Sequence, residues 1–455
     1  MLSPIRTLST VVALSLAAGA ALAQTSQRSP SCDGLRYSGN FLLNSAKMNF
    51  DLAADKKQTD PARFQRALAD ARRQLDQAAR GGNADAMTLA FFYGELGAQS
   101  GDLVAADTNF TRAEATATDA CKREIARVRR NEWAVFANGA VNQQRSGNVD
   151  SALVLLRKGN VIYRAEPTGY LRMAAIFASR TQTDSAIVYA QLACRASDDP
   201  QYLELRKAAC FTAAQLLQGA NRQPEAEVAY RDYLRIAPRD LPGMAGLGAA
   251  LLAQHKTAEA NALYDTLQVA ADTVSDPEVL FETATGLVRA QRYPLAARMF
   301  ERELTMNRCD RDGLYNLASA YNSMHDSVHM LPIARRLVAV DSMNGGSLAM
   351  LAQAQVLVRD TASIGTLQRL QNLPWSFDLV RFAPADSTAQ LQAGISNHRD
   401  SALPAFRLTI EFVNGACEPV TQAVVEVPEV PANGSQPIDV TGRGRGIRAY
   451  RYKTN

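Results

Sequence analysis

The sequence predicts a mostly α-helical fold, a right-handed solenoid of about eight helical hairpins followed by a small C-terminal all-β sandwich. Two observations lead to this prediction. A unit of about 34 residues is written four times between Lys207 and Asn344, with starts at 207, 241, 277 and 311. After Pro374, the helical spacing of apolar residues gives way to an alternation of apolar and polar residues.

Each copy of the repeated unit reads as a helix, a turn and a second helix. In the first copy, small and apolar residues recur at helical spacing from Cys210 to Leu217 and again from Ala226 to Tyr233, and Pro238 closes the unit. Small residues at one fixed place let the two helices approach closely, and aromatic rings at another fill the space between hairpins. The small residues are Ala214, Gly248, Ala284 and Ala318, and the aromatic residues are Tyr230, Tyr264 and Phe300.

This pattern resembles the tetratricopeptide repeat (TPR). Further copies begin at Met87, Trp133 and Pro167 before the central run, and one begins at Gly345 after it. Gly101-Asp102 and Gly147-Asn148 stand at two of the turns, where Gly permits a left-handed residue and the next side chain can cap a helix. The resemblance implies about eight TPR-type hairpins that bind a protein or peptide in a concave groove and carry out no chemistry.

The predicted domain organisation has four parts. Before the array we expect two capping helices, Phe41 to Ala54 and Pro61 to Arg80, and between the first two repeats an inserted helical stretch, Asp119 to Arg130, with five basic residues. The parts are a signal peptide (1–23), an N-terminal leader with capping helices (24–86), the TPR-like array (87–373) and the β-sandwich module (376–455).

The N-terminal segment has the features of an export signal. Arg6 supplies positive charge, Leu8 to Leu22 is apolar, and Ala21-Leu22-Ala23 is a cleavage site, so we expect the mature chain to begin at Gln24. The alternative is a membrane anchor, but the apolar run is shorter than the roughly 20 residues that a spanning helix needs. We therefore expect a periplasmic or secreted protein, of a Gram-negative type of bacterium by composition, with no stable membrane insertion after cleavage.

Export makes the six cysteines candidates for disulfides. Cys194 lies near the end of one predicted second helix, and Cys210 lies in the first helix of the next unit, so we predict that they are bonded. The alternative is a pair of buried thiols. For the others we favour Cys32 with Cys121 and Cys309 with Cys417, although spacing alone does not fix this connectivity.

The C-terminal part reads as several short strands. Alternation runs from Ala405 to Val413 and from Val420 to Val427, with Asn414-Gly415 as the turn, and shorter strands follow at Ile438–Val440 and Ile447–Tyr452. Strands of this kind with Gly and Pro turns resemble a sandwich of immunoglobulin or fibronectin type. Their order is left open.

Catalytic and cofactor chemistry have poor candidates in this sequence, so we predict no enzyme, no cofactor and no metal. His325 and His329 have the spacing of a zinc pair, but they straddle a predicted turn, and Asp326 stands where a hydrolase would have Glu. Gly442 to Gly446 could be an RNA-binding tract, and a flexible turn is the preferred interpretation. A net charge of +4 is too small to indicate a nucleic-acid partner.

Residues one turn away from the packing positions of the first helices would line the groove. One TPR subfamily clamps a C-terminal carboxylate, but Phe91, Glu95 and Thr168 stand where this clamp has Lys, Asn and Lys, so we reject it. The main hypothesis is an exported scaffold for a protein or peptide, with a carbohydrate- or surface-binding β module as the alternative. The identity of the partner and the oligomeric state are left open. The predicted ligand-binding residues are Asn138, Arg172, Phe281, Tyr315, Asn316 and Asn322.

Overall fold

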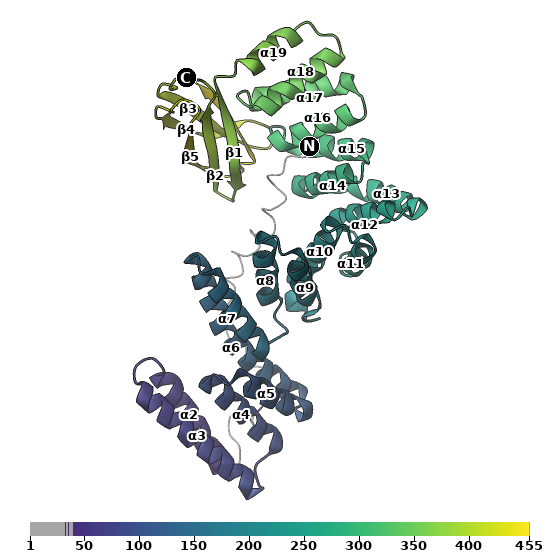
Figure 1. Ribbon diagram of the computed structural model, residues 1–455. Coiled ribbons are helices and arrows are strands. Elements are labelled where there is room, and N and C mark those ends of the chain that lie inside the picture. Colours follow the sequence, from purple (N-terminus) through teal and green to yellow (C-terminus); the bar gives the residue numbers. More distant parts are fainter. Residues whose placement is uncertain (1–31, 33–34, 36–39, 455) are drawn as a thin grey trace. The chain divides into compact units, whose positions relative to one another are not determined.

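The computed structural model of the chain describes Cys32, Leu35 and residues 40–454 (Figure 1). The predicted signal peptide, with its cleavage site after Ala23, lies outside the described residues. The described chain forms two compact units, one ending at Ala220 and one beginning at Asn221, and each is described by itself. No helix in the described part of the chain is both long enough and apolar enough to cross a membrane.

The first unit consists of consecutive antiparallel helices. Asp60 caps the second of them by accepting a hydrogen bond from the Arg63 amide at 3.0 Å, with Pro61 in the first turn, as the sequence predicts. The helices are α2 (Phe41–Lys56), α3 (Pro61–Gly81), α4 (Ala86–Ser100), α5 (Leu103–Thr116), α6 (Asp119–Arg145), α7 (Val149–Ile162), α8 (Pro167–Ser179), α9 (Thr183–Arg195) and α10 (Leu203–Gly219), with a short 3₁₀ turn η3 (Pro200–Tyr202) before α10.

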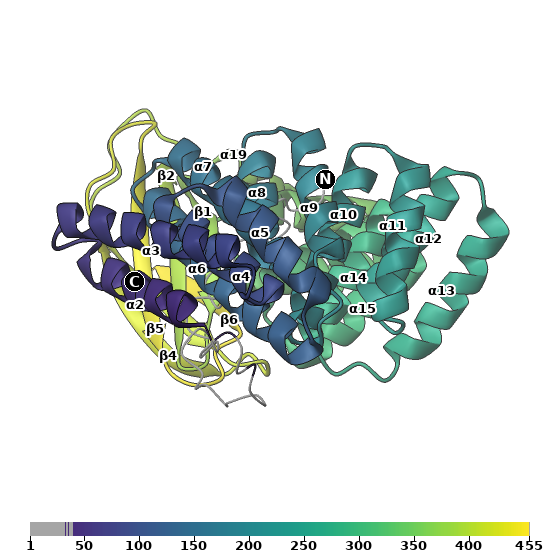
Figure 2. The same ribbon diagram turned by 90° about the horizontal axis from the view of Figure 1, so that it is seen from below.

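The second unit continues the helical array and ends in strands. Figure 1 and Figure 2 show the two helices of the α12/α13 hairpin running side by side. The helices are α11 (Gln223–Ile236), α12 (Leu241–Ala253), α13 (Thr257–Ala271), α14 (Pro277–Arg289), α15 (Tyr293–Met306), α16 (Arg311–Ser323), α17 (Ser327–Val340), α18 (Gly345–Leu357) and α19 (Ser363–Gln371). The strands are β1 (Trp375–Pro384), β2 (Thr388–Asn397), β3 (Phe406–Val413), β4 (Pro419–Val427), β5 (Ser435–Arg443) and β6 (Ala449–Thr454).

One left-handed residue ends the first helix of each of the eight predicted repeats. In the first two repeats this residue is Gly, which adopts a positive φ without strain. In the other six it carries a side chain, and such a conformation costs of order 1 kcal/mol at each site. The eight residues are Gly101, Gly147, Thr181, Asn221, His255, Gln291, His325 and Arg359, with φ between 56° and 85°. This recurrence confirms an α-solenoid of eight hairpins, which α2 and α3 precede.

Small residues allow the close helix packing that the repeat pattern predicts. A Cβ on Gly248 of α12 would lie 2.5 Å from Cζ of Tyr264 on α13, so the ring occupies the space that a side chain would need. Ala284 and Ala318, at the equivalent places of the next two hairpins, are fully buried. The ring of Tyr230 on α11 lies similarly close to the Gly246 position of α12, so neighbouring hairpins also pack closely.

The stretch from Asp119 to Arg130, which the sequence analysis treats as an inserted helix, is the first half of the single helix α6. Its Arg129 is only 5% exposed and is held by Asp107 at 2.7 Å, by Glu114 at 2.9 Å and by the carbonyl of Ile162 at 2.8 Å. Paired and hydrogen-bonded in this way, a buried guanidinium is stable away from water. The basic residues of this stretch are thus partly structural, because Arg129 joins α5, α6 and the end of α7.

All six cysteines are paired. The structure joins Cys194 to Cys210 with Cα atoms 4.7 Å apart, Cys32 to Cys121 at 5.0 Å, and Cys309 to Cys417 at 5.4 Å. These are the three pairings that the sequence analysis favours. The first two bonds lie within the first unit, and the third joins the helical array of the second unit to the loop between β3 and β4.

The C-terminal strands form two three-stranded antiparallel sheets, ordered β1-β2-β5 and β4-β3-β6. Their inner faces share one core, in which Phe377 of β1 stacks on Tyr452 of β6 with ring centroids 4.3 Å apart. This confirms a small all-β sandwich. Sequence analysis missed β1 and β2, although the alternating residues Ala389, Leu391, Ala393 and Ile395 of β2 are no more than 2% exposed and carry the expected period of two.

Candidate functional site: a pocket between the last hairpins and the β-sandwich

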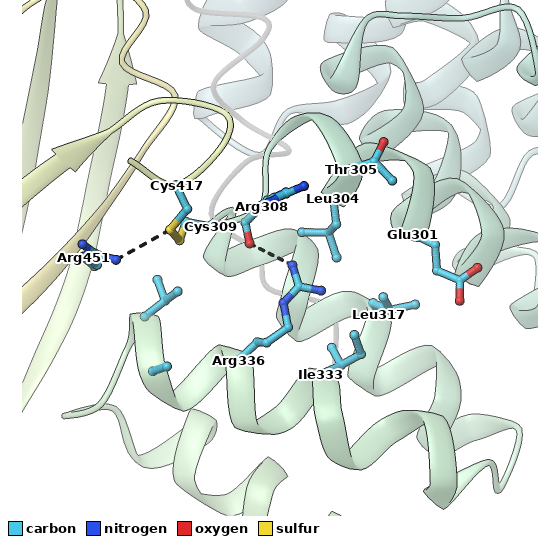
Figure 3. Close-up of a pocket in the computed structure, with 12 residues that line it drawn as sticks. Glu301, Leu304, Thr305, Arg308, Cys309, Leu317, Ile333, Arg336, Cys417 and Arg451 are labelled. Atoms are coloured by element: carbon cyan, nitrogen blue, oxygen red, sulfur yellow. Dashed lines mark hydrogen bonds between the residues drawn. A yellow bond between two sulfur atoms is a disulfide. The ribbon is translucent and has the colours of Figure 1, made fainter. Parts of the chain in front are cut away.

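A pocket of about 740 Å³ lies where α15, α16 and α17 meet the β-sandwich within the second unit (Figure 3). This size is typical of ligand sites. Its apolar surface comes from one side of each helix, because residues three and four apart share a helix face. The apolar lining residues are Leu304, Leu317, Ile333, Ala339 and Val340, and the polar and sulfur-bearing ones are Glu301, Thr305, Arg308, Cys309, Arg336, Cys417 and Arg451.

Two arginines give the pocket an unbalanced positive charge. Arg336 of α17 donates a hydrogen bond to the backbone carbonyl of Arg308 at 3.0 Å, and Figure 3 shows its guanidinium lying among the lining residues. Partial burial and the nearby charge of Arg308 lower the pKa of Arg336, with Glu303 opposing them. Neither Arg308 nor Arg336 forms an ion pair with any carboxylate in the described part of the chain.

The other charged groups at the pocket have partners. Glu301 accepts a hydrogen bond from the Tyr321 hydroxyl, and burial together with this carboxylate raises the pKa of Tyr321. Arg451 of β6 is paired with Glu411 at 2.5 Å, and Lys453 contacts the same carboxylate at 2.9 Å. Hydrogen bonds from Lys453 and Arg451 lower the pKa of Glu411. Among the lining arginines, Arg308 and Arg336 are therefore the two without a carboxylate partner in the described part of the chain.

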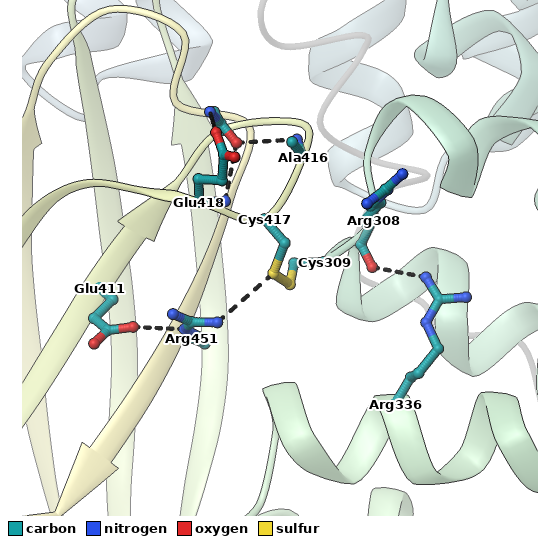
Figure 4. The surroundings of a disulfide bond; sticks show 9 residues. Arg308, Cys309, Arg336, Glu411, Ala416, Cys417, Glu418 and Arg451 are labelled. Atoms are coloured by element: carbon teal, nitrogen blue, oxygen red, sulfur yellow. Dashed lines mark hydrogen bonds and ion pairs between the residues drawn. A yellow bond between two sulfur atoms is a disulfide. The ribbon is translucent and has the colours of Figure 1, made fainter.

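The disulfide between Cys309 and Cys417 forms one wall of the pocket (Figure 4). Beside it, the Arg308 amide donates to the carbonyl of Gly415 at 2.9 Å, and a guanidinium N–H of Arg451 lies 3.9 Å from the sulfur of Cys417. A Cβ on Gly415 would overlap the carbonyl oxygen of Met306, so only glycine fits this approach of the loop to α15.

A buried polar network fixes the sandwich to the array next to this wall. Asp341, at the end of α17, accepts from the Tyr452 hydroxyl at 2.6 Å, from Arg311 at 2.8 Å and from the Ser347 hydroxyl at 3.0 Å. The Tyr452 oxygen in turn accepts from the amide of Met343 at 3.0 Å. Charge-assisted bonds of this kind are strong when buried, so β6 is anchored to α16, α17 and α18.

The four predicted ligand-binding residues of the second unit differ in burial, because two are buried and two are half-buried. Phe281 is 6% exposed and packs edge-on against Phe300 at 5.6 Å, and Asn316 is 3% exposed, so neither offers the open groove surface that the sequence analysis assigns to it. Tyr315 is half-buried beneath the guanidinium of Arg311 at 5.7 Å. Asn322, also half-buried, accepts a hydrogen bond from Gln353 of α18 at 2.9 Å.

The two predicted residues of the first unit lie on separate helices. Asn138 is exposed on α6, and Arg172 is half-buried on α8, where burial and the charge of Arg145 lower its pKa. Their assignment to ligand binding stays a prediction. The pocket arginines were missed because Arg308 and Arg336 lie 28 residues apart, and their only sequence signal is the position of Arg308 beside Cys309.

The two histidines, His325 and His329, lie in the turn between α16 and α17 and in the first turn of α17. His325 is the left-handed turn residue, with φ 59°, and Asp326 caps α17 and contacts Nδ1 of His329 at 2.7 Å. The ring of His329 stacks on Tyr321 at 5.5 Å. In the described ranges, no three His, Cys, Asp or Glu residues are grouped so as to hold a metal ion.

No family model matches the sequence, and neither does any curated protein. Solved structures with a similar helix arrangement include yeast Tom70 (13% identity, TM-score 0.35, 73% of this chain and 75% of that chain). A second is a tetratricopeptide repeat protein from Parabacteroides merdae (11% identity, TM-score 0.36, 53% of this chain and 93% of that chain). A third is PilF from Pseudomonas aeruginosa (17% identity, TM-score 0.34, 50% of this chain and 98% of that chain). The chain is similar to these proteins at scores too low to carry weight, so the fold assignment rests on the hairpins themselves.

Proposed function

We propose that the protein is a non-enzymatic, exported scaffold that binds a protein or peptide partner along the first helices of its hairpins. The observation that carries this proposal is a stripe on α16. Tyr315, Ser319 and Asn322 are spaced at i, i+4 and i+7, and all three are half-buried. The bond from Gln353 to Asn322 extends the stripe to α18. An aromatic ring beside amides and hydroxyls offers apolar area together with partners for a peptide backbone.

Two further features support export. All six cysteines are paired, which suits an oxidising compartment such as the periplasm or the exterior of the cell. The leader around Arg6 and Ala21-Leu22-Ala23 has the pattern of a cleavable signal. A place in an envelope or secretion assembly follows as part of the proposal. The alternative, a carbohydrate- or surface-binding β module with the repeats as a spacer, is less favoured because the sandwich is bonded to the array through Asp341 and Cys309.

Site-specific photo-cross-linking tests the proposal. A benzoylphenylalanine at Ser319 should give one discrete cross-linked product with a protein of the host envelope. The matched control is Val328 on α17, which is 73% exposed and lies off the stripe. A product from Val328 but not from Ser319 would contradict the assignment of the stripe. Sequencing of the mature N-terminus checks export, and an uncleaved chain starting at Met1 would contradict it.

A further inference from the structure

We infer that the pocket beside the Cys309–Cys417 disulfide is a second binding site, for a partner segment that carries a carboxylate next to a large apolar side chain. This inference rests on the proposed scaffold function but concerns a different surface. The pocket is lined mainly by the second helices α15 and α17, with Leu317 from α16, whereas the proposed stripe consists of other residues of α16 and of Gln353 on α18. The two surfaces can therefore be tested separately.

The two arginines of the pocket differ from other arginines of the chain in their partners. Arg308 and Arg336 are exposed at the pocket and have no carboxylate partner among the described residues, whereas the buried Arg129 is paired with Asp107 and the half-buried Arg311 with Asp341. Arg336 donates to the carbonyl of Arg308, and the like charges of the two arginines repel each other, an effect that the nearby carboxylate of Glu303 opposes more weakly. An incoming anion would relieve this repulsion. A planar guanidinium matches a carboxylate with two parallel hydrogen bonds, so this group is the expected ligand.

An apolar surface lies beside the charged groups of the pocket. Leu317 and Ile333 line the pocket beside Arg336 and present carbon only, and Leu304 extends this surface toward Thr305 (Figure 3). A carboxylate alone would leave this apolar area in water. An apolar side chain next to the carboxylate would bury this apolar area, and each Å² removed from water contributes about 25 cal/mol of binding free energy. The positive charge and the apolar lining of the pocket together fit a ligand segment with an acidic residue next to Leu, Ile, Phe or Met.

The two sides of the pocket are fixed to each other by bonds within the chain. The disulfide, the bond from the Arg308 amide to Gly415 and the Asp341 network hold the two sides of the pocket together without a ligand. A preformed site loses little conformational freedom on binding. The sandwich therefore has a part in recognition, since it supplies the wall of a site whose charge comes from the helical array.

The test is a peptide selection on the oxidised mature protein. Random displayed heptapeptides are selected on the wild type and counter-selected on the Arg308→Gln/Arg336→Gln variant. We expect enrichment of Asp or Glu next to a large apolar residue. One enriched peptide, fluorescently labelled, should bind the double variant at least about tenfold more weakly than the wild type. Its Asn or Gln isostere should lose binding to a similar degree.

The matched control is Arg298→Gln. Arg298 is exposed on α15, lies outside the pocket lining and loses one positive charge in the same kind of substitution as each pocket arginine, so binding should not change. If the double variant melts below the wild type, Arg336→Lys takes its place, because Lys keeps the charge but not the planar fork.

Selected peptides without acidic enrichment, or with equal affinity for the double variant, would overturn the inference. Failure to select any peptide would overturn it as well. Sodium oleate forms a separate arm, since it joins a carboxylate to an apolar chain without a peptide. Arginine-dependent binding of oleate with no selected peptide would assign the pocket to a fatty acid. A failed selection together with a Ser319 cross-link would remove this site and leave the scaffold function standing.

Discussion

Removing the Tyr452 hydroxyl should loosen the β-sandwich from the helical array. In Tyr452→Phe, the buried carboxylate of Asp341 loses a donor at 2.6 Å, and the amide of Met343 loses its acceptor at 3.0 Å. A hydrogen bond to a charged group contributes about 1.5 to 3 kcal/mol, and an amide left without a partner costs about 1 kcal/mol more. The expected loss of unfolding free energy is therefore about 3 kcal/mol.

The measurement is urea unfolding followed by the fluorescence of Trp375, which packs on Phe406 at 5.1 Å inside the sandwich. A Trp133→Phe background removes the chain's other tryptophan. Tyr450→Phe is the matched control, because Tyr450 is 5% exposed and its hydroxyl makes no hydrogen bond to any described residue. Its effect should stay within about 0.5 kcal/mol. Equal midpoints for the two variants would refute the anchoring role of Asp341.

Three further outcomes follow from packing, backbone conformation and charge. Gly248→Leu should lower stability by about 1 to 3 kcal/mol because the Tyr264 ring fills its space, whereas Gly365→Leu on α19, with no atom within 4 Å of the new Cβ and with a better helix former in place of Gly, should not lower the melting temperature. Gln291→Gly should raise stability by about 0.5 to 1 kcal/mol by relieving a φ of 57°, and a lower melting temperature would contradict this. Burial raises the pKa of the Glu282 carboxyl from 4.5 to about 7, so the folded state binds the proton more tightly and stability should fall as the pH rises from 4.5 through 7. In Glu282→Gln that part of the pH dependence should vanish, with a gain of about 1 to 3 kcal/mol at pH 8 in urea unfolding, and an unchanged pH profile would contradict the raised pKa.

The helical part of the fold was predictable because each hairpin repeats the same spacing of small, apolar and aromatic residues along the sequence. The sequence predicts Gly248 as a close-packing position within its hairpin and Tyr264 as a ring between hairpins, and the structure places the Tyr264 ring against Gly248 inside the hairpin. A break in periodicity is harder to interpret than a repeat. The Asp119–Arg130 stretch was read as a separate insertion because nothing local shows that α6 continues through it, or that Arg129 meets Asp107 across the core.

The candidate site could not be predicted in detail because it is formed by contacts between residues whose spacing in the sequence follows no pattern. Burial of Phe281 and Asn316 follows from the rotation of their helices against neighbouring hairpins, and a shift of one helical position moves a residue from groove to core. The attachment of the sandwich arises from Tyr452 and Asp341, which are 111 residues apart. An Asp and a Tyr at that separation give no pattern to read.

The covalent link between Cys309 and Cys417 closes a ring of chain that contains the whole of the last two hairpins and the first three strands. A protease that cuts the connection between Gln371 and Trp375 would therefore leave a nicked molecule whose two pieces stay joined, heavier only by the water added on hydrolysis, and a reductant would be needed to separate them covalently. In an environment rich in proteases, the β-sandwich would therefore stay covalently attached to the helical array after a cut between α19 and β1.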